Sequence, residues 1–105
     1  FRATKNNYRS VLQKVTGKVG KGYEAHHTLP QKYRMQFEKL GINIDKPGNV
    51  VWREANGHRK KSNALTSEWT RFMARGKSPT KKQIYQFRDK MEKKYFGNKY
   101  DTPTK

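Results

Sequence analysis

The residues of this chain that could carry out chemistry near neutral pH are its three histidines. His26 and His27 are adjacent, in a short segment that ends at Pro30, and His58 lies downstream of them. An unperturbed imidazole has a pKa of about 6.5, and the neutral ring is also a common metal ligand. The chain has no cysteine, which excludes disulfides and thiolate metal sites. The histidines are therefore the candidates for a near-neutral base and for nitrogen ligands.

The charge of the chain indicates its partner. Its 105 residues include 25 Lys and Arg against 8 Asp and Glu, which gives a formal net charge of +17 at pH 7. Such a field concentrates polyanions at the surface, and nucleic acid is the obvious polyanion. A membrane partner is disfavoured, because the sequence has no long apolar run and no strongly basic amphipathic anchor. A histidine cluster in so cationic a chain predicts an enzyme that acts on phosphodiesters.

The length fits one domain, residues 1–105, and 31% apolar content allows a modest core. The sequence begins with Phe1 and a polar stretch, without an initiator methionine or a signal peptide. We therefore expect an excised domain that comes from the C-terminal part of a longer protein. Residues 98–105 are expected to form a flexible tail.

Apolar spacing and chain breakers predict an α+β fold that is mostly helical. The expected order is a helix over 4–16, a strand over 23–29, a helix over 30–40, a turn-rich loop over 42–49, a strand over 49–53, and helices over 58–75 and 80–97. Gly57 is expected to precede the first of these last two helices, and Leu40 is expected to face inward. Trp69, Phe72 and Met91 are expected in the core. The polar cluster falls on the middle of the chain, so both terminal helices are expected to be structural.

Hydrolysis of a phosphodiester needs a base for water, a cation for the phosphate charge, and a group that orients the base. Neighbouring residues on a strand point to opposite faces. His26 and His27 can therefore meet different partners, one a metal ion and the other the attacking water. His27 is a candidate for the base.

The segment Glu-x-His-His-x-x-Pro that begins at Glu24 resembles the strand end of colicin-type DNases, in the HNH/endonuclease VII superfamily. The separation of Asn49 and His58 also matches that of these enzymes. The resemblance implies a ββα-metal core (His-Me finger) over about residues 22–75, with flanking terminal helices. It also implies that His26 and His58 bind the metal, that His27 is the general base, and that Asn49 orients His27.

One position departs from the colicin pattern, which has another histidine one helical turn after the position of His58. Ser62 stands there, followed by Asn63, so both are candidate supporting residues. This helix is similar to the HNH helix of RNA-guided nucleases, which use two protein ligands and hydrated Mg²⁺. The resemblance thus implies one divalent ion on two histidines and waters. Its identity stays open among Mg²⁺, Mn²⁺, Zn²⁺ and Ni²⁺, because imidazole suits the last three better than Mg²⁺.

Residues 25–72, roughly half of the chain, most resemble toxin nucleases with an "AHH" or "LHH" signature. The shared features are Ala-His-His-x-x-Pro-Gln, a Gly-Ile-Asn-Ile-Asp helix end, a downstream histidine and a Trp-x-x-Phe helix. These nucleases are the C-terminal tips of bacterial polymorphic toxins. The resemblance implies delivery into the cytoplasm of a target bacterium, an acidic immunity protein, and attack on DNA or RNA. DNA with low sequence specificity is favoured by this analogy.

Several basic residues are candidates for contact with nucleic acid. Arg59, Lys60 and Lys61 begin the helix beside His58, and a phosphate must lie next to the site. Arg53 is a candidate for stabilising charge in the transition state. Glu24 is interpreted as a structural partner of a nearby Lys or Arg, and as a candidate supporting residue of the site.

Other interpretations stay open at this point. The histidines can be ordinary surface residues, and Asn49, which follows a glycine, can simply form a turn. Two rival functions also remain. One is a metal-independent RNase in which His27 and a second group act through the 2′-hydroxyl. The other is a non-catalytic basic nucleic-acid-binding protein, which would give no reason for clustered histidines.

Overall fold

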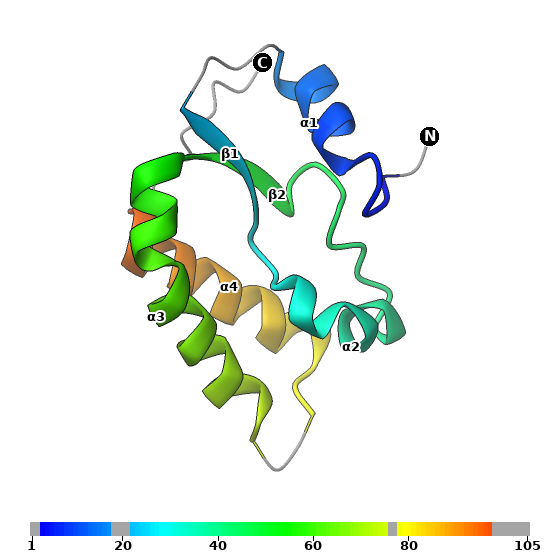
Figure 1. Cartoon of the computed structure of the whole chain (residues 1–105). Coiled ribbons are helices and arrows are strands. Elements are labelled where there is room, and N and C mark those ends of the chain that lie inside the picture. The colour runs from blue at the N-terminus through cyan, green and yellow to red at the C-terminus, as the bar shows by residue number, and fades with distance from the viewer. Residues whose placement is uncertain (1–2, 18–21, 76–77, 98–105) are drawn as a thin grey trace.

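Two short strands, β1 (Tyr23–His27) and β2 (Val50–Glu54), pair antiparallel in a computed structural model of the chain (Figure 1). The structure describes residues 3–17, 22–75 and 78–97. Within these ranges the sheet is accompanied by one 3-10 turn and four α-helices: η1 (Gln31–Tyr33), α1 (Tyr8–Thr16), α2 (Arg34–Lys39), α3 (Ala55–Met73) and α4 (Lys81–Phe96). The predicted α+β class and order of elements are confirmed. The predicted tail over 98–105 lies outside the described residues.

Both faces of the sheet are covered, with α1 on one side and α3 on the other (Figure 1). Ala25 pairs with Trp52 in the register of the strands, and both pack toward Leu12 of α1. Glu24 precedes Ala25 and pairs with Arg53, which follows Trp52. The side chains of this pair therefore lie on the other face of the sheet. Side chains alternate along a strand, so the two histidines at the end of β1 belong to different faces. Covering both faces buries these polar residues, which then require partners.

Aromatic packing holds α3 against α4. Trp69 is fully buried, and its ring meets Phe87 edge-on at 4.8 Å between centroids. Phe72 stacks on Phe87 at 4.1 Å, and Met91 is buried in the same cluster. Edge-to-face and stacked pairs add about 0.5–1.5 kcal/mol each to what area burial contributes. The predicted core positions of Trp69, Phe72 and Met91 are confirmed.

The structure differs from the predictions at Gly57 and at Leu40. Helix α3 begins at Ala55 directly after β2, so Gly57 lies inside its first turn. Glycine costs about 1 kcal/mol there relative to alanine, which packing of the helix against the sheet overrides. Leu40 is 40% exposed, because α2 ends at Lys39 and Gly41 reverses the chain with a positive φ of 77°.

The first helix also starts later than predicted, at Tyr8, and the third predicted element is divided into η1 and α2. The loop that follows α2 contributes to the core, since Ile42 and Ile44 are both buried. This loop was predicted only as a connection. No helix of the described ranges combines the length and the apolar character that are needed to cross a membrane.

The N-terminus of α4 is capped by side-chain hydrogen bonds whose contribution to stability can be measured. The spacing of Thr80 and Gln83 in the sequence is typical of a capping box. In the structure the Thr80 side chain accepts from the backbone N–H of Gln83, and the Gln83 side chain accepts from the Thr80 N–H, as a capping box requires. We expect Thr80→Ala to lower the free energy of unfolding by about 1 kcal/mol, measured by urea denaturation. Ser78→Ala, at an exposed position before the helix, is the control and should change stability by less than about 0.5 kcal/mol. Equal effects of the two substitutions would contradict the cap.

Candidate functional site

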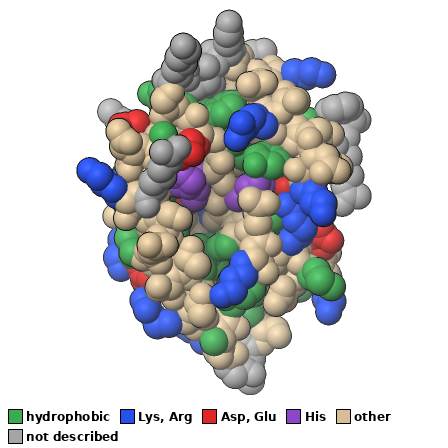
Figure 2. Space-filling view, in the orientation of Figure 1, with side chains coloured by type: hydrophobic (Ala, Val, Ile, Leu, Met, Phe, Trp, Pro, Cys, Tyr) green, Lys and Arg blue, Asp and Glu red, His purple; other side chains and the backbone are tan. Residues whose placement is uncertain are grey.

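The three histidines meet at the end of β1, where all of them line a hollow of about 280 Å³. In Figure 2 histidine side chains flank a depression near the middle of the visible face. The hollow is also lined by Gln31 and Lys32 of η1 and by Ser62 and Thr66 of α3. The chain therefore brings together residues that are more than 30 positions apart, and it gives them an opening toward solvent.

His26 and His58 face each other across this hollow. Nδ1 of His26 lies 2.9 Å from Nε2 of His58, and the ring planes meet at 69°. The outer nitrogen of each ring meets a carboxylate: Nε2 of His26 lies 3.0 Å from Glu92, and Nδ1 of His58 lies 3.2 Å from Glu24. An ionised carboxylate only accepts hydrogen bonds, so each outer nitrogen carries the proton. In neutral rings the two facing nitrogens then both present lone pairs.

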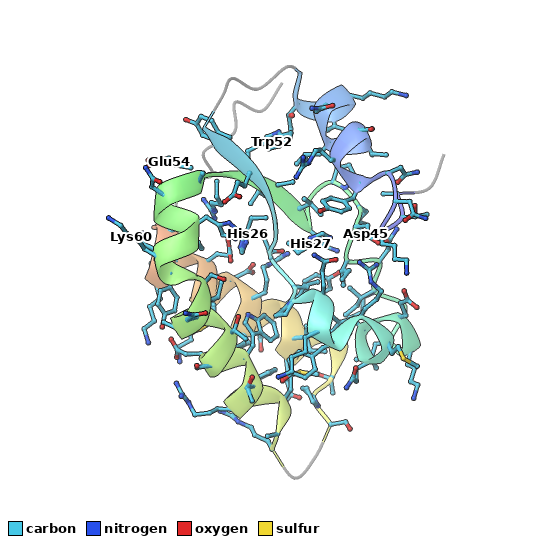
Figure 3. The ribbon with its side chains drawn as sticks, viewed as in Figure 1. His26, His27, Asp45, Trp52, Glu54 and Lys60 are labelled. Atoms are coloured by element: carbon cyan, nitrogen blue, oxygen red, sulfur yellow. The ribbon has the colours of Figure 1, made fainter. Side chains whose placement is uncertain are left out.

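His27 turns to the other side of the strand, toward the loop after α2 (Figure 3). Its Nε2 donates to Oδ1 of Asp45 at 2.9 Å, and the ring of Tyr8 packs against it edge-on at 4.4 Å. The Arg34 guanidinium donates to both carboxylate oxygens of Asp45, at 2.5 and 3.1 Å. Among the described residues nothing bonds Nδ1 of His27. That nitrogen is left with the lone pair that a general base needs.

Burial sets the protonation of these groups. It lowers the pKa of His27 by more than the hydrogen bond to Asp45 raises it. Burial also lowers the pKa of His58, and the neighbouring His26 acts in the same direction. For Asp45 and Glu92 burial raises the pKa, but hydrogen bonds from Arg34 and His27, and from His26 and Arg53, outweigh it and leave each pKa below its ordinary value. Neutral His27 and His58 beside ionised carboxylates follow from these shifts.

Asn49 does not take the position that the resemblance implied. Its side-chain amide donates to the Asn43 carbonyl at 2.9 Å and its oxygen accepts from Arg88 at 3.1 Å. Within the described ranges the group that contacts His27 Nε2 is Asp45. Asp45 follows the quoted Gly-Ile-Asn-Ile motif, but its approach to His27 depends on how the loop folds back, which residue spacing does not reveal.

Arg53 is a correction to the sequence analysis. It is 1% exposed, its guanidinium lies 2.6 Å from Glu92, and it stands 4.2 Å from the ring centre of Phe96. A side chain so enclosed presents no surface to a phosphate. Helix α4, which was expected to be structural, supplies Glu92 as a hydrogen-bond partner of His26.

The other predicted basic contacts occupy different surroundings. Lys60 is exposed and points away from the sheet on the outer side of α3 (Figure 3). Lys61 is half-buried with its Nζ 5.2 Å from the Phe96 ring centre. Arg59 lies on α3, and its side chain is outside the described part of the chain. Lys32, at the rim of the hollow, is the basic residue that the sequence analysis missed.

The two supporting residues predicted on α3 also differ in their surroundings. Ser62, one turn after His58, lines the hollow, whereas Asn63 is exposed. Of the two predicted supporting residues on α3, Ser62 is therefore the one that reaches the hollow.

The donors fit a weakly held ion better than a closed metal site. The described residues hold no group of three or more histidine, cysteine or carboxylate side chains arranged around one point. Two facing imidazole lone pairs 2.9 Å apart repel unless a positive centre lies between them. Bonds of about 2.0–2.1 Å at a tetrahedral angle place two ligand nitrogens roughly 3.3 Å apart. Opening of the pair by a few tenths of an ångström would therefore admit an ion that is completed by water.

Comparisons of this chain with protein-family models, with curated proteins and with solved structures found no match.

The pKa shifts predict how stability depends on pH. His27 and His58 have folded pKa values below 6.5, and Asp45 and Glu92 lie below 3.8 and 4.5. In all four cases the unfolded chain binds more protons, so the free energy of unfolding should rise from about pH 4 to about pH 7. Urea denaturation at a series of pH values measures this slope. His27→Gln should flatten it just below pH 6.5, and a slope of the opposite sign would contradict the assignments.

Proposed function

We propose that this chain is a metal-dependent endonuclease that hydrolyses phosphodiester bonds with a His26, His27 and His58 centre. The supporting observation is the shared hollow, in which two imidazoles face each other and a third is held by a carboxylate. The net charge of +17 suits a polyanionic substrate. The ββα-metal core implied by the resemblance is part of this proposal, with β1, β2 and the start of α3 as its elements.

His27 is the general base of the proposed reaction. Asp45 accepts a hydrogen bond from the Nε2–H group of His27, which leaves Nδ1 of the same ring to take a proton from water. Arg34 fixes Asp45 through two hydrogen bonds, so the carboxylate cannot rotate away from the ring. The lowered pKa of His27 keeps the ring neutral at pH 7. Asp45 is thus a positioning residue, in the place proposed from the sequence for Asn49.

His26 and His58 hold the cation of the proposed site through Nδ1 and Nε2. A bound divalent ion would stabilise charge on the phosphate and on the departing oxygen. Lys32 and Ser62, which both line the hollow, are the proposed contacts for the phosphate of the substrate. This attack by external water needs no 2′-hydroxyl, so the chemistry itself does not choose between DNA and RNA.

A metal-independent RNase is the second candidate, and one distance favours it. The separation of 2.9 Å between His26 and His58 is that of a hydrogen bond, which a single shared proton would form. Such a pair could exchange a proton with the substrate while His27 acts on the 2′-hydroxyl.

The biological setting is proposed from the resemblance alone. The chain would act as the cytotoxic C-terminal domain of a bacterial toxin, with DNA favoured as the target. An acidic immunity protein would protect the producing cell by covering the cationic hollow, because opposite potentials favour such an interface.

The decisive test is digestion of plasmid DNA and of RNA with and without EDTA, followed by restoration of each divalent metal. We expect EDTA to stop cleavage and a restored metal to recover it. His27→Ala should reduce cleavage by about 10²–10⁴-fold while circular dichroism stays that of the parent. RNA cleavage that persists in EDTA would instead support the metal-independent RNase. Undiminished cleavage by His27→Ala would reject both mechanisms.

Asp45 and Asn49 can be separated by paired substitutions. Asp45→Asn places an amide, which can donate as well as accept, against His27 and removes the charge that fixes the tautomer. We expect a loss of cleavage rate of about 10²–10⁴-fold. Asn49→Ala, in the same loop region, removes more atoms but does not touch His27 and should lose far less cleavage rate. Equal losses in the two folded variants would return the orienting role to Asn49.

A further inference from the structure

The inner face of α4 forms a wall of the histidine site. Arg88, Glu92 and Phe96 follow one another at intervals of four residues, which places them in one row on a helix. Arg88 donates to Asn49 and to Thr28, at 3.1 and 3.2 Å. The ring of Phe96 lies 5.2 Å from that of His26. This helix follows the strand–strand–helix segment in the chain, so its row of contacts is an addition to the proposed core.

Glu92 is the polar centre of this row. Its carboxylate is buried and receives two charged or polar donors, Nε2 of His26 at 3.0 Å and the Arg53 guanidinium at 2.6 Å. Each donor meets a different carboxylate oxygen. The Arg53 contact fixes the orientation of the carboxylate, and the other oxygen is thereby directed at His26.

This arrangement determines which nitrogen of His26 is free. Because the carboxylate accepts at Nε2, that nitrogen carries the proton, and Nδ1 faces His58 as a lone pair. The opposite tautomer could donate from Nδ1 to the lone pair of His58, but it would set the Nε2 lone pair against a buried carboxylate. The cost of that mismatch is high in a buried, low-dielectric environment.

We propose that Glu92, held by Arg53, is a positioning residue that fixes the His26 tautomer and thereby prepares Nδ1 to bind a divalent cation with His58. The inference rests on the proposed function in one respect, namely that the facing nitrogens are the metal-binding atoms. Partners that hold the outer nitrogen of a ligating histidine typically change metal affinity by about 10–100-fold when they are removed.

Glu92→Gln is the informative variant, because it keeps the shape of the side chain. Its amide has one oxygen, so it cannot present a separate accepting oxygen to His26 and to Arg53, and its NH₂ group must face one of these donors. Glu68→Gln is the matched control. Glu68 also joins α3 to α4, through Lys94 and Tyr95, but it contacts none of the histidines in the described structure.

The first measurement is the ¹⁵N NMR spectrum of the histidine rings in metal-free parent protein, which reports the tautomer directly. We expect His26 to be protonated at Nε2. A ring protonated at Nδ1 in the folded parent overturns the proposal, and this result does not depend on whether any variant folds.

The second measurement is calorimetric titration with Zn²⁺ alone, without nucleic acid. We expect Glu92→Gln to bind about 10–100-fold more weakly than the parent and Glu68→Gln to match the parent. A folded Glu92→Gln protein with parental affinity and an unchanged His26 tautomer overturns the positioning role. A parent that has the Nε2-protonated ring but binds no Zn²⁺ or other divalent ion overturns the metal-dependent function and the metal-binding part of this inference together.

Discussion

The site depends on the pairing of each imidazole with one carboxylate. His26 meets Glu92, His27 meets Asp45 and His58 meets Glu24. The chain has only 8 acidic residues against 25 basic ones, so a large share of its carboxylates serve as partners of the three imidazole rings. Each carboxylate selects the protonated nitrogen of its ring and leaves the other nitrogen for chemistry. Without these pairs, three neutral histidines could adopt either tautomer, and their free nitrogens would have no fixed direction.

The two-stranded sheet explains how adjacent histidines come to meet different carboxylates. Alternation sends His26 toward α3 and α4 and His27 toward α1 and the loop of Asp45. A sheet this small is marginal alone, so helices must cover both of its faces. The same coverage that stabilises the sheet buries the histidines and lowers the pKa of His27. The stability of the sheet and the neutral form of His27 therefore have a common origin in burial.

The elements that could be predicted from sequence are those with strong local signals. The alternation of β1, the capping box at Thr80 and the aromatic spacing of Trp69 and Phe72 all depend on neighbours within a few residues. The proximity of His58 to the histidine pair was predicted through the family resemblance, and the structure brings these rings together.

The partners of the histidines could not be predicted in this way. Asp45 reaches His27 only because a loop turns back after α2, and Glu92 reaches His26 from a helix 66 residues away. In the sequence Glu92 is one acidic residue in a lysine-rich helix, and Arg53 is one of many cations. Their mutual burial is a tertiary event that reverses the usual rule that such residues stay in water. Because this burial does not show in the sequence, Arg53 was wrongly interpreted as a contact for the phosphate.

The docking of α4 has a consequence for when the centre exists at all. Contacts between residues so distant in sequence form late and cooperatively, since the intervening chain must first be ordered. A polypeptide that is still emerging from the ribosome, or is being threaded extended through a narrow channel, carries all three imidazoles without an assembled centre. The chain has no cysteine, so no disulfide has to be broken or remade when it unfolds and refolds. The histidine centre is thus assembled only in a chain whose last described helix has packed against the sheet.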